Sequence, residues 1–212
     1  AHLSKWHASI HWRELLSGHL VSDQSIDRPI IHFTRPQAAK EAKDTVDVEK
    51  GGWQDGVLAI YPVKINEFRI NDAEIFYREN WKSKPLHVSD FNFKAQNIRN
   101  VRSKPSEYPS PVHLDAVVFD NGRLTLDGQA DFFSEPHAGI NADIKLDNVD
   151  LADLQPVTSR YQIHLTQGVV SADGHAEYAP QAQTVRLKTL SLRDVRLDFV
   201  HHEPAFALFE PD

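Results

Sequence analysis

Apolar and polar residues alternate through most of the second half of the chain, and this period of two predicts β-strands. The clearest run covers residues 112–118. It ends at Asn121-Gly122, a dipeptide that is typical of tight hairpin turns. Two more alternating runs follow at residues 124–132 and 138–146. The pattern therefore predicts three consecutive antiparallel strands in a meander.

The alternation is interrupted at residues 151–156, where Leu-Ala-Asp-Leu-Gln-Pro predicts a short turn of helix. Further strands are predicted over residues 161–165 and 170–178, and then up to Phe199. In the last of these runs the apolar positions change phase after Leu187, and a change of one residue is what a β-bulge produces.

The first half of the chain is less regular but also favours strands. The expected elements are an extended segment over 3–12, a helical turn ended by Gly18, strands at 19–26 and 30–33, a hairpin at 64–70 and 73–77, and a strand with a phase slip at 86–95. The remaining segments are expected to be a polar loop or short helix at 36–52, a short helix at 53–60 and a proline-rich loop at 100–111.

These elements predict a mainly β protein, a long curved antiparallel sheet with one or two short helices. No flexible linker divides the chain, so residues 1–212 are expected to form a single module. The predicted helices are too few to cover about ten strands. An uncovered apolar face must close on itself or meet another hydrophobic partner.

Composition narrows the range of chemistry. The 212 residues include no cysteine, which excludes disulfides, cysteine–metal sites and a cysteine nucleophile. No methionine is present either, even at position 1, which suggests a processed protein or a piece of a longer chain. The net charge of −7, with no basic block, argues against nucleic acid as a partner. No apolar run approaches the roughly 18 residues that span a bilayer.

Candidate reactive groups are few. The twelve histidines include His7 and His11, but an extended segment would separate these two by about 13 Å, which is too far for one metal ion. Asp115 and Asp127 form a candidate carboxylate pair for acid–base chemistry, although thirty acidic residues make chance pairs certain. No nucleophile elbow, dinucleotide fingerprint or P-loop is present. We therefore expect no enzyme activity, no catalytic residue, no metal and no cofactor.

Four segments carry a family resemblance. Residues 144–154 (IKLDNVDLADL), the stretch at 64–75, and the segments 10–18 and 27–31 resemble elements of the AsmA-like periplasmic protein superfamily of Gram-negative bacteria. The matches occur in the family's order and cover most of residues 3–200. The resemblance implies a taco-like β-groove in a soluble fragment whose parent protein has an upstream anchor in the inner membrane and lies in the periplasm.

The resemblance to AsmA-like proteins also implies transport of phospholipid between the inner and outer membranes, with the acyl chains shielded in the groove. The partners would then be phospholipid and the rest of the parent chain. The groove candidates are Val112, Leu114, Ala116, Val118, Leu124, Leu126, Ala130, Phe132, Ile140, Ala142, Ile144, Leu146, Ile163 and Leu165. Two alternatives stay open: these residues are ordinary core, or the chain is a scaffolding module in outer-membrane biogenesis that binds other envelope proteins and no lipid.

Overall fold

The computed structural model describes residues 5–34, 63–78, 85–99, 107–134, 137–158, 163–180 and 182–199. The described part contains ten strands: β1 (Lys5–Ile10), β2 (Leu20–Asp27), β3 (Ile30–Thr34), β4 (Val63–Arg78), β5 (Leu86–Arg99), β6 (Ser110–Val118), β7 (Gly122–Asp131), β8 (Gly139–Asp150), β9 (Ile163–Ala179) and β10 (Ala182–Phe199). Three short helices accompany them: α1 (Trp12–Leu16), the 3₁₀ helix η2 (Leu151–Leu154) and α4 (Gln155–Thr158).

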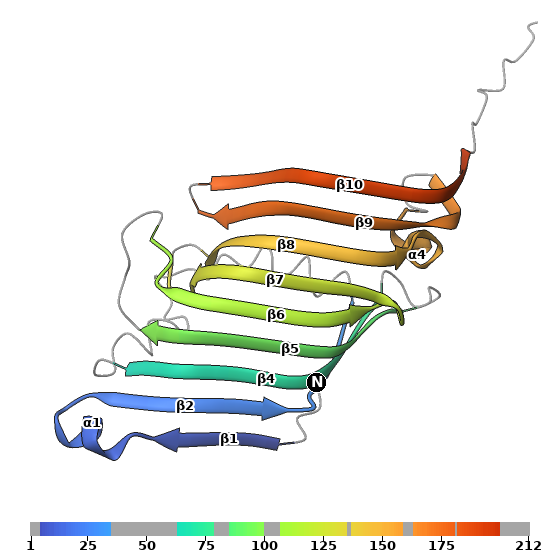
Figure 1. Ribbon diagram of the computed structural model, residues 1–212. Helices are drawn as coiled ribbons and strands as arrows, with labels where there is room; N and C mark the ends of the chain where they lie inside the picture. The colour runs from blue at the N-terminus through green and yellow to red at the C-terminus, as the bar shows by residue number, and fades with distance from the viewer. Residues whose placement is uncertain are drawn as a thin grey trace, which may run out of the picture.

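All ten strands belong to one open sheet, and Figure 1 shows the strands of its main order side by side in a single layer from β1 to β10. The order is β1-β2-β4-β5-β6-β7-β8-β9-β10, and β3 also pairs with β4. The predicted fold class is therefore confirmed: the protein is mainly β, built on one long, open sheet with few helices.

The predicted meander is β6, β7 and β8. Leu114 pairs with Leu126, and Leu126 pairs with Ile144, so the alternating positions of the three strands stand side by side. The expected helical turn is also present as η2 and α4. The Asp150 side chain caps η2 by accepting a hydrogen bond from the backbone N–H of Ala152.

The predicted bulge in the last strand is confirmed. The register of β10 against β9 shifts between Leu187 and Thr189, where the apolar pattern changes phase. At the other end of the sheet, β1, α1, β2 and β3 correspond to the elements expected there, and Gly18 follows α1 with a φ of 83°.

Two features of the N-terminal half differ from expectation. First, β2 and β3 pair with β4 in parallel, so the sheet is mixed rather than wholly antiparallel. Second, residues 64–77 form no hairpin: β4 runs straight through Asn71-Asp72 as one strand. Asp72 adopts the left-handed conformation, with a φ of 52°, as a bulge residue. The pairing is continuous because β2 lies beside the first half of β4 and β3 beside the second half.

Similar irregularities follow one another across the sheet, near the end where β6 turns into β7. Each has a residue with positive φ: Asp72 in β4, Asp90 in β5, Asn148 in β8, Gly168 in β9 and Asp194 in β10. Bulges bend a strand and increase its twist, so a row of them curves the sheet along its length. The same end of the sheet bends in Figure 1.

Side chains satisfy backbone groups that the bulges leave unpaired. The N–H of Asp72 donates to the Asn92 side-chain oxygen at 3.0 Å, and the N–H of Asn148 donates to the Ser171 hydroxyl at 3.0 Å. Three expectations lie outside the described residues, namely the loop or helix at 36–52, the helix at 53–60 and most of the loop at 100–111.

Candidate functional site

An unbroken apolar row crosses the sheet, with one residue from each strand of the main order. Residues paired directly across neighbouring strands lie on the same face, so the register defines which side chains stand together. From β1 to β10 this apolar row consists of Trp6, Ile26, Ile70, Phe93, Leu114, Leu126, Ile144, Gly174 and Leu187.

The adjacent row, one residue away, lies on the opposite face because side chains alternate along a strand. From β1 to β10 this polar row consists of His7, Ser25, Arg69, Lys94, His113, Asp127, Asp143, His175 and Arg186. The two faces of the sheet thus differ completely along these rows. One presents only apolar residues, and the other presents only polar and charged ones.

The large side chains of the apolar row are not buried. Trp6 and Leu187, in the outermost strands, are 63% and 56% exposed, and the six between them are half-buried. Among the described residues, the largest side chain that is fully buried is only a valine, Val149. A closed core of this size would bury leucines and phenylalanines fully. The apolar face is therefore incompletely covered.

Two small clusters close the face near the strand ends. One consists of Ala95, Ile98, Val112, Ala130 and Phe133, and the other of Val118, Val149, Leu151 and Val170, with η2 folded over it. Leu114 and Ile144 belong to neither cluster. Neither cluster therefore covers the part of the apolar face around Leu114 and Ile144.

Eleven of the fourteen predicted groove residues lie together on this face of β6, β7 and β8. The five smaller ones are buried: Val112, Ala116, Val118, Ala130 and Ala142. The six larger ones are half-buried: Leu114, Leu124, Leu126, Ile140, Ile144 and Leu146. The small residues thus provide close packing between the strands, and the large ones provide the surface.

The other three predicted residues lie at the margin of this group. Phe132 is in the turn after β7 and packs half-buried against the cluster that contains Phe133. Ile163 and Leu165 lie in β9, where the register pairs them with Phe199 and Leu197 of β10.

The polar face is organised by acid–base pairs between strands. Asp143 of β8 lies 3.1 Å from Nδ1 of His175 in the neighbouring strand β9, and it accepts a hydrogen bond at 3.1 Å from Lys188 in β10, one strand further on. Lys94 lies 3.0 Å from Glu67. The polar face therefore presents exposed charged groups, in contrast to the apolar face.

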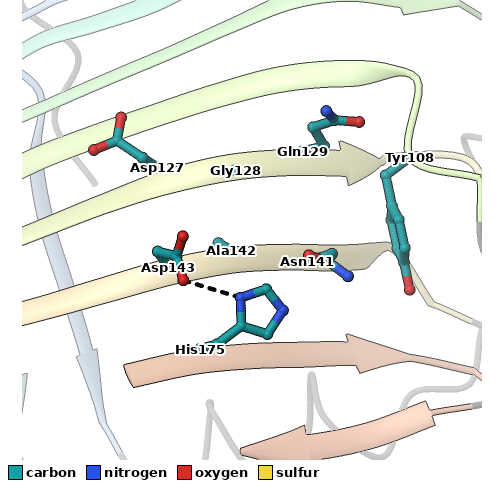
Figure 2. A pocket seen from close by; sticks show the side chains of 8 residues that line it. All are labelled: Tyr108, Asp127, Gly128, Gln129, Asn141, Ala142, Asp143 and His175. Atoms are coloured by element: carbon teal, nitrogen blue, oxygen red, sulfur yellow. Dashed lines mark hydrogen bonds and ion pairs between the residues drawn. The ribbon is translucent and has the colours of Figure 1, made fainter. Parts of the chain in front are cut away.

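A shallow pocket of about 270 Å³ lies on the polar face of β7, β8 and β9. Figure 2 shows its lining, with Asp127 and Gln129 on one strand, Asn141 and Asp143 on the next, and Tyr108 at one end. The Tyr108 hydroxyl donates to Glu177 at 2.7 Å. Burial, followed by this contact with a carboxylate, raises the pKa of Tyr108 to about 12.

Ion pairing also shifts the pKa values of Asp143 and of its partner Lys188. The hydrogen bond from Lys188, and then that with His175, lowers the pKa of Asp143, and the Asp143 carboxylate in turn raises the pKa of Lys188. At the other end of the sheet, the hydrogen bonds of His11 and Asn66 lower the pKa of Asp23.

The structure brings Asp115 and Asp127 together around one histidine. Nδ1 of His113 lies 2.5 Å from Asp127, and its Nε2 lies 3.6 Å from Asp115. His7 and His11 instead contact separate carboxylates, those of Asp27 and Asp23. Within the described ranges, no three histidine, aspartate or glutamate side chains are grouped so as to hold a metal ion, and no helix is long and apolar enough to cross a membrane.

Sequence reasoning missed two features of this surface. One is the extension of the apolar row into β1 and β10, where Val185 is 82% exposed. The other is the regular ladder of charged residues on the opposite face. Comparison with protein-family models, with curated proteins and with solved structures finds no match to this chain.

Proposed function

We propose that the apolar face of the sheet shields lipid acyl chains from water. In this proposal the chain is a segment of an envelope protein that transports phospholipid between the inner and outer membranes of a Gram-negative bacterium. The observation that carries it is the apolar row, which runs through nine strands without a polar residue while its large side chains stay partly exposed.

The dimensions of the row suit an acyl chain. Nine strands are separated by eight spacings of about 4.8 Å, so the row is about 38 Å long. The hydrocarbon core of a whole bilayer is about 30 Å thick, so the acyl chains of one leaflet extend about 15 Å. The row could therefore accommodate an extended acyl chain at several positions along its length.

Shielding an acyl chain from water releases a large free energy and requires no specific polar contact between the chain and the protein. Each methylene removed from water contributes about 0.8 kcal/mol, so ten methylenes contribute about 8 kcal/mol before ordering costs. A uniform apolar row lets a chain move from strand to strand without losing a specific contact. This suits transport better than tight storage, and it requires no cofactor and no catalytic step.

The cellular setting of the proposal comes from the resemblance of residues 10–18, 27–31, 64–75 and 144–154 to AsmA-like periplasmic proteins. On this basis we propose that the chain lies in the periplasm, with the rest of the parent protein anchored in the inner membrane. The polar row is consistent with this setting, because the face that carries no lipid would contact water.

A photocrosslinking experiment tests the proposal at matched positions on the two faces. Photoreactive residues are placed at Leu126 and Ile144, which pair in register on the apolar face, and at Thr125 and Lys145, which pair on the opposite face. The chain is then expressed in Gram-negative cells, and lipid is recovered by mild extraction and identified by mass spectrometry.

Phospholipid should crosslink at Leu126 and Ile144 and not at Thr125 or Lys145. Crosslinking on neither face, with no phospholipid recovered, would refute lipid shielding and leave the scaffolding function as the better explanation. Equal crosslinking on both faces would also refute it, because it would indicate nonspecific contact with membrane.

A further inference from the structure

The edge of β10 is the most exposed apolar surface of the described sheet. Its strand is 18 residues long, and four large aliphatic residues on the apolar face are more than half exposed: Val185, Leu187, Leu190 and Leu192. In the described part of the chain, β9 is the only strand that pairs with β10. A long edge with unpaired N–H and C=O groups and an exposed apolar side is a template for another strand.

Charge on the other face of β10 restricts what this strand can be. Residues 182–193 contain Arg186, Lys188 and Arg193 and no acidic residue, although the whole chain has a net charge of −7. Lys188 already bonds Asp143, and Arg193 donates to Asn148. Arg186 ends the polar row and forms no side-chain hydrogen bond or ion pair with another described residue.

Elsewhere in the sheet, some positively charged side chains on the polar face form ion pairs with carboxylates of an adjacent strand. Some of the sheet's acid–base contacts join neighbouring strands on the polar face, as Lys94 of β5 does with Glu67 of β4 and His113 of β6 with Asp127 of β7. Arg186 lacks such a neighbour on its outer side because β10 is the last strand of the described sheet. A strand added at this edge would continue both rows if it carried apolar residues beside Leu187 and an acidic residue beside Arg186.

The chain's own edges fit this requirement poorly. The opposite edge strand, β1, has Lys5, His7 and Ser9 on the polar face, so it would set basic residues against Arg186. The rest of β10 carries Asp194 and Asp198, but pairing of residues 182–193 with the same segment of a second copy would bring two segments with three cations each together. Like charges on directly opposed strands destabilise a sheet.

We propose that β10 is a docking edge for an extended segment of another polypeptide in which apolar and acidic residues alternate. The segment adds an eleventh strand, extends the apolar row past Leu187 and places a carboxylate against Arg186. This inference does not depend on lipid binding, because it rests on the edge and its charge.

The test uses fluorescent peptides of about ten residues, the usual length of a longer strand. One alternates valine with aspartate, a second alternates valine with lysine, and a third is the aspartate peptide with alternate backbone nitrogens methylated. Binding to the whole chain is followed by fluorescence anisotropy at low and high salt. The oligomeric state is measured in parallel by light scattering.

The aspartate peptide should bind at least about tenfold more tightly than the lysine peptide, and salt should weaken its binding. Methylation should abolish binding, because it removes the N–H groups that pair with the edge. The double variant R186E/R193E should reverse the preference of the two peptides. The control R123E reverses one charge on the polar face of β7, far from the edge, and should leave the preference unchanged.

Three results would overturn the proposal. The first is equal binding of the two peptides, which would leave only nonspecific apolar contact. The second is unchanged binding of the methylated peptide, which would exclude strand addition. The third is a dimer of the chain that R186E/R193E dissociates, which would make the edge a self-association surface. Circular dichroism of each variant verifies that the fold is retained.

Discussion

Gly128 provides a sharp test of how closely the strands of the meander pack. It lies in β7, opposite Ala142 of β8 and Val112 of β6. A Cβ at this position would meet the backbone oxygen of Asn141 and would lie 2.5 Å from both Cα and Cβ of Ala142. Ordinary contacts between such atoms are about 3.5–4.0 Å. The obstacle is mainly backbone, which no side-chain rotation can move.

The expected cost of Gly128→Ala follows from these contacts. Overpacking of a close-packed site costs about 1–3 kcal/mol and occasionally more, and a backbone obstacle favours the upper end. Replacing glycine also restricts the unfolded chain, which offsets about 0.4–1 kcal/mol. We expect a net loss of about 2 kcal/mol or more in the free energy of unfolding.

Urea unfolding followed by circular dichroism measures this loss. With a slope of about 1–3 kcal/mol per molar urea, the midpoint should fall by about 1 M. Gly139→Ala is the matched control, because its nearest obstacle is an atom of the Tyr108 ring at 3.1 Å, which can move. If Gly128→Ala unfolds at the same urea concentration as Gly139→Ala, the strands β7 and β8 do not approach each other at Gly128 as closely as described.

Three more predictions concern single groups. Lys188→Ala should raise the pKa of Asp143 toward its ordinary value of 3.8, as measured by NMR titration of the carboxyl group. In the native chain, this ion pair should contribute to stability between the two pKa values. Its contribution is lost as the pH falls through the lowered pKa of Asp143 or rises through the raised pKa of Lys188. Glu177→Gln should lower the pKa of Tyr108 from about 12 only part of the way to 10, because burial is the larger cause; a tyrosinate absorbance titration would show an unchanged pKa if the contact is absent. Val149→Ala, at a fully buried position, should cost about 2 kcal/mol in urea unfolding, and a cost below about 0.5 kcal/mol would mean that the cluster around Val149 is not packed.

Local signals in the sequence were sufficient for the meander. Asn121-Gly122 marks the turn, and the alternation on both sides sets the register, because a slip of one residue would turn Leu114 and Leu126 to the wrong face. The bulge after Leu187 was predictable for the same reason. Its phase change is visible in the sequence without knowledge of the neighbouring strand.

The error at Asn71-Asp72 has a physical origin. Asparagine and aspartate tolerate the left-handed conformation, which serves both a hairpin turn and a bulge. The choice between them depends on strands far away in the sequence. Here β2 and β3 both lie along β4 and keep it extended through Asp72, and an alternating pattern does not distinguish parallel from antiparallel neighbours.

The candidate surface was predicted in part. Alternation placed Leu126 and Ile144 on one face, but only the register shows that the row continues to Trp6 and Leu187. The meeting of Asp115 and Asp127 at His113 also depends on the register, because thirty acidic residues offer many possible pairs. Exposure at the edge strands cannot be read from a local pattern.

The parallel pairing of β2 with β4 has a consequence for the order in which the sheet folds. Asp23 and Asn66, which share a hydrogen bond across this pair, are 43 residues apart, whereas Val118 and Gly122 pair across a tight turn. Closing the longer loop costs roughly 2 kcal/mol more in chain entropy. Strands β6 to β8 can therefore form first and provide a surface on which β4 aligns. The N-terminal strands are then added last, and the end of the sheet that contains Trp6 should be the first to open when the protein is destabilised.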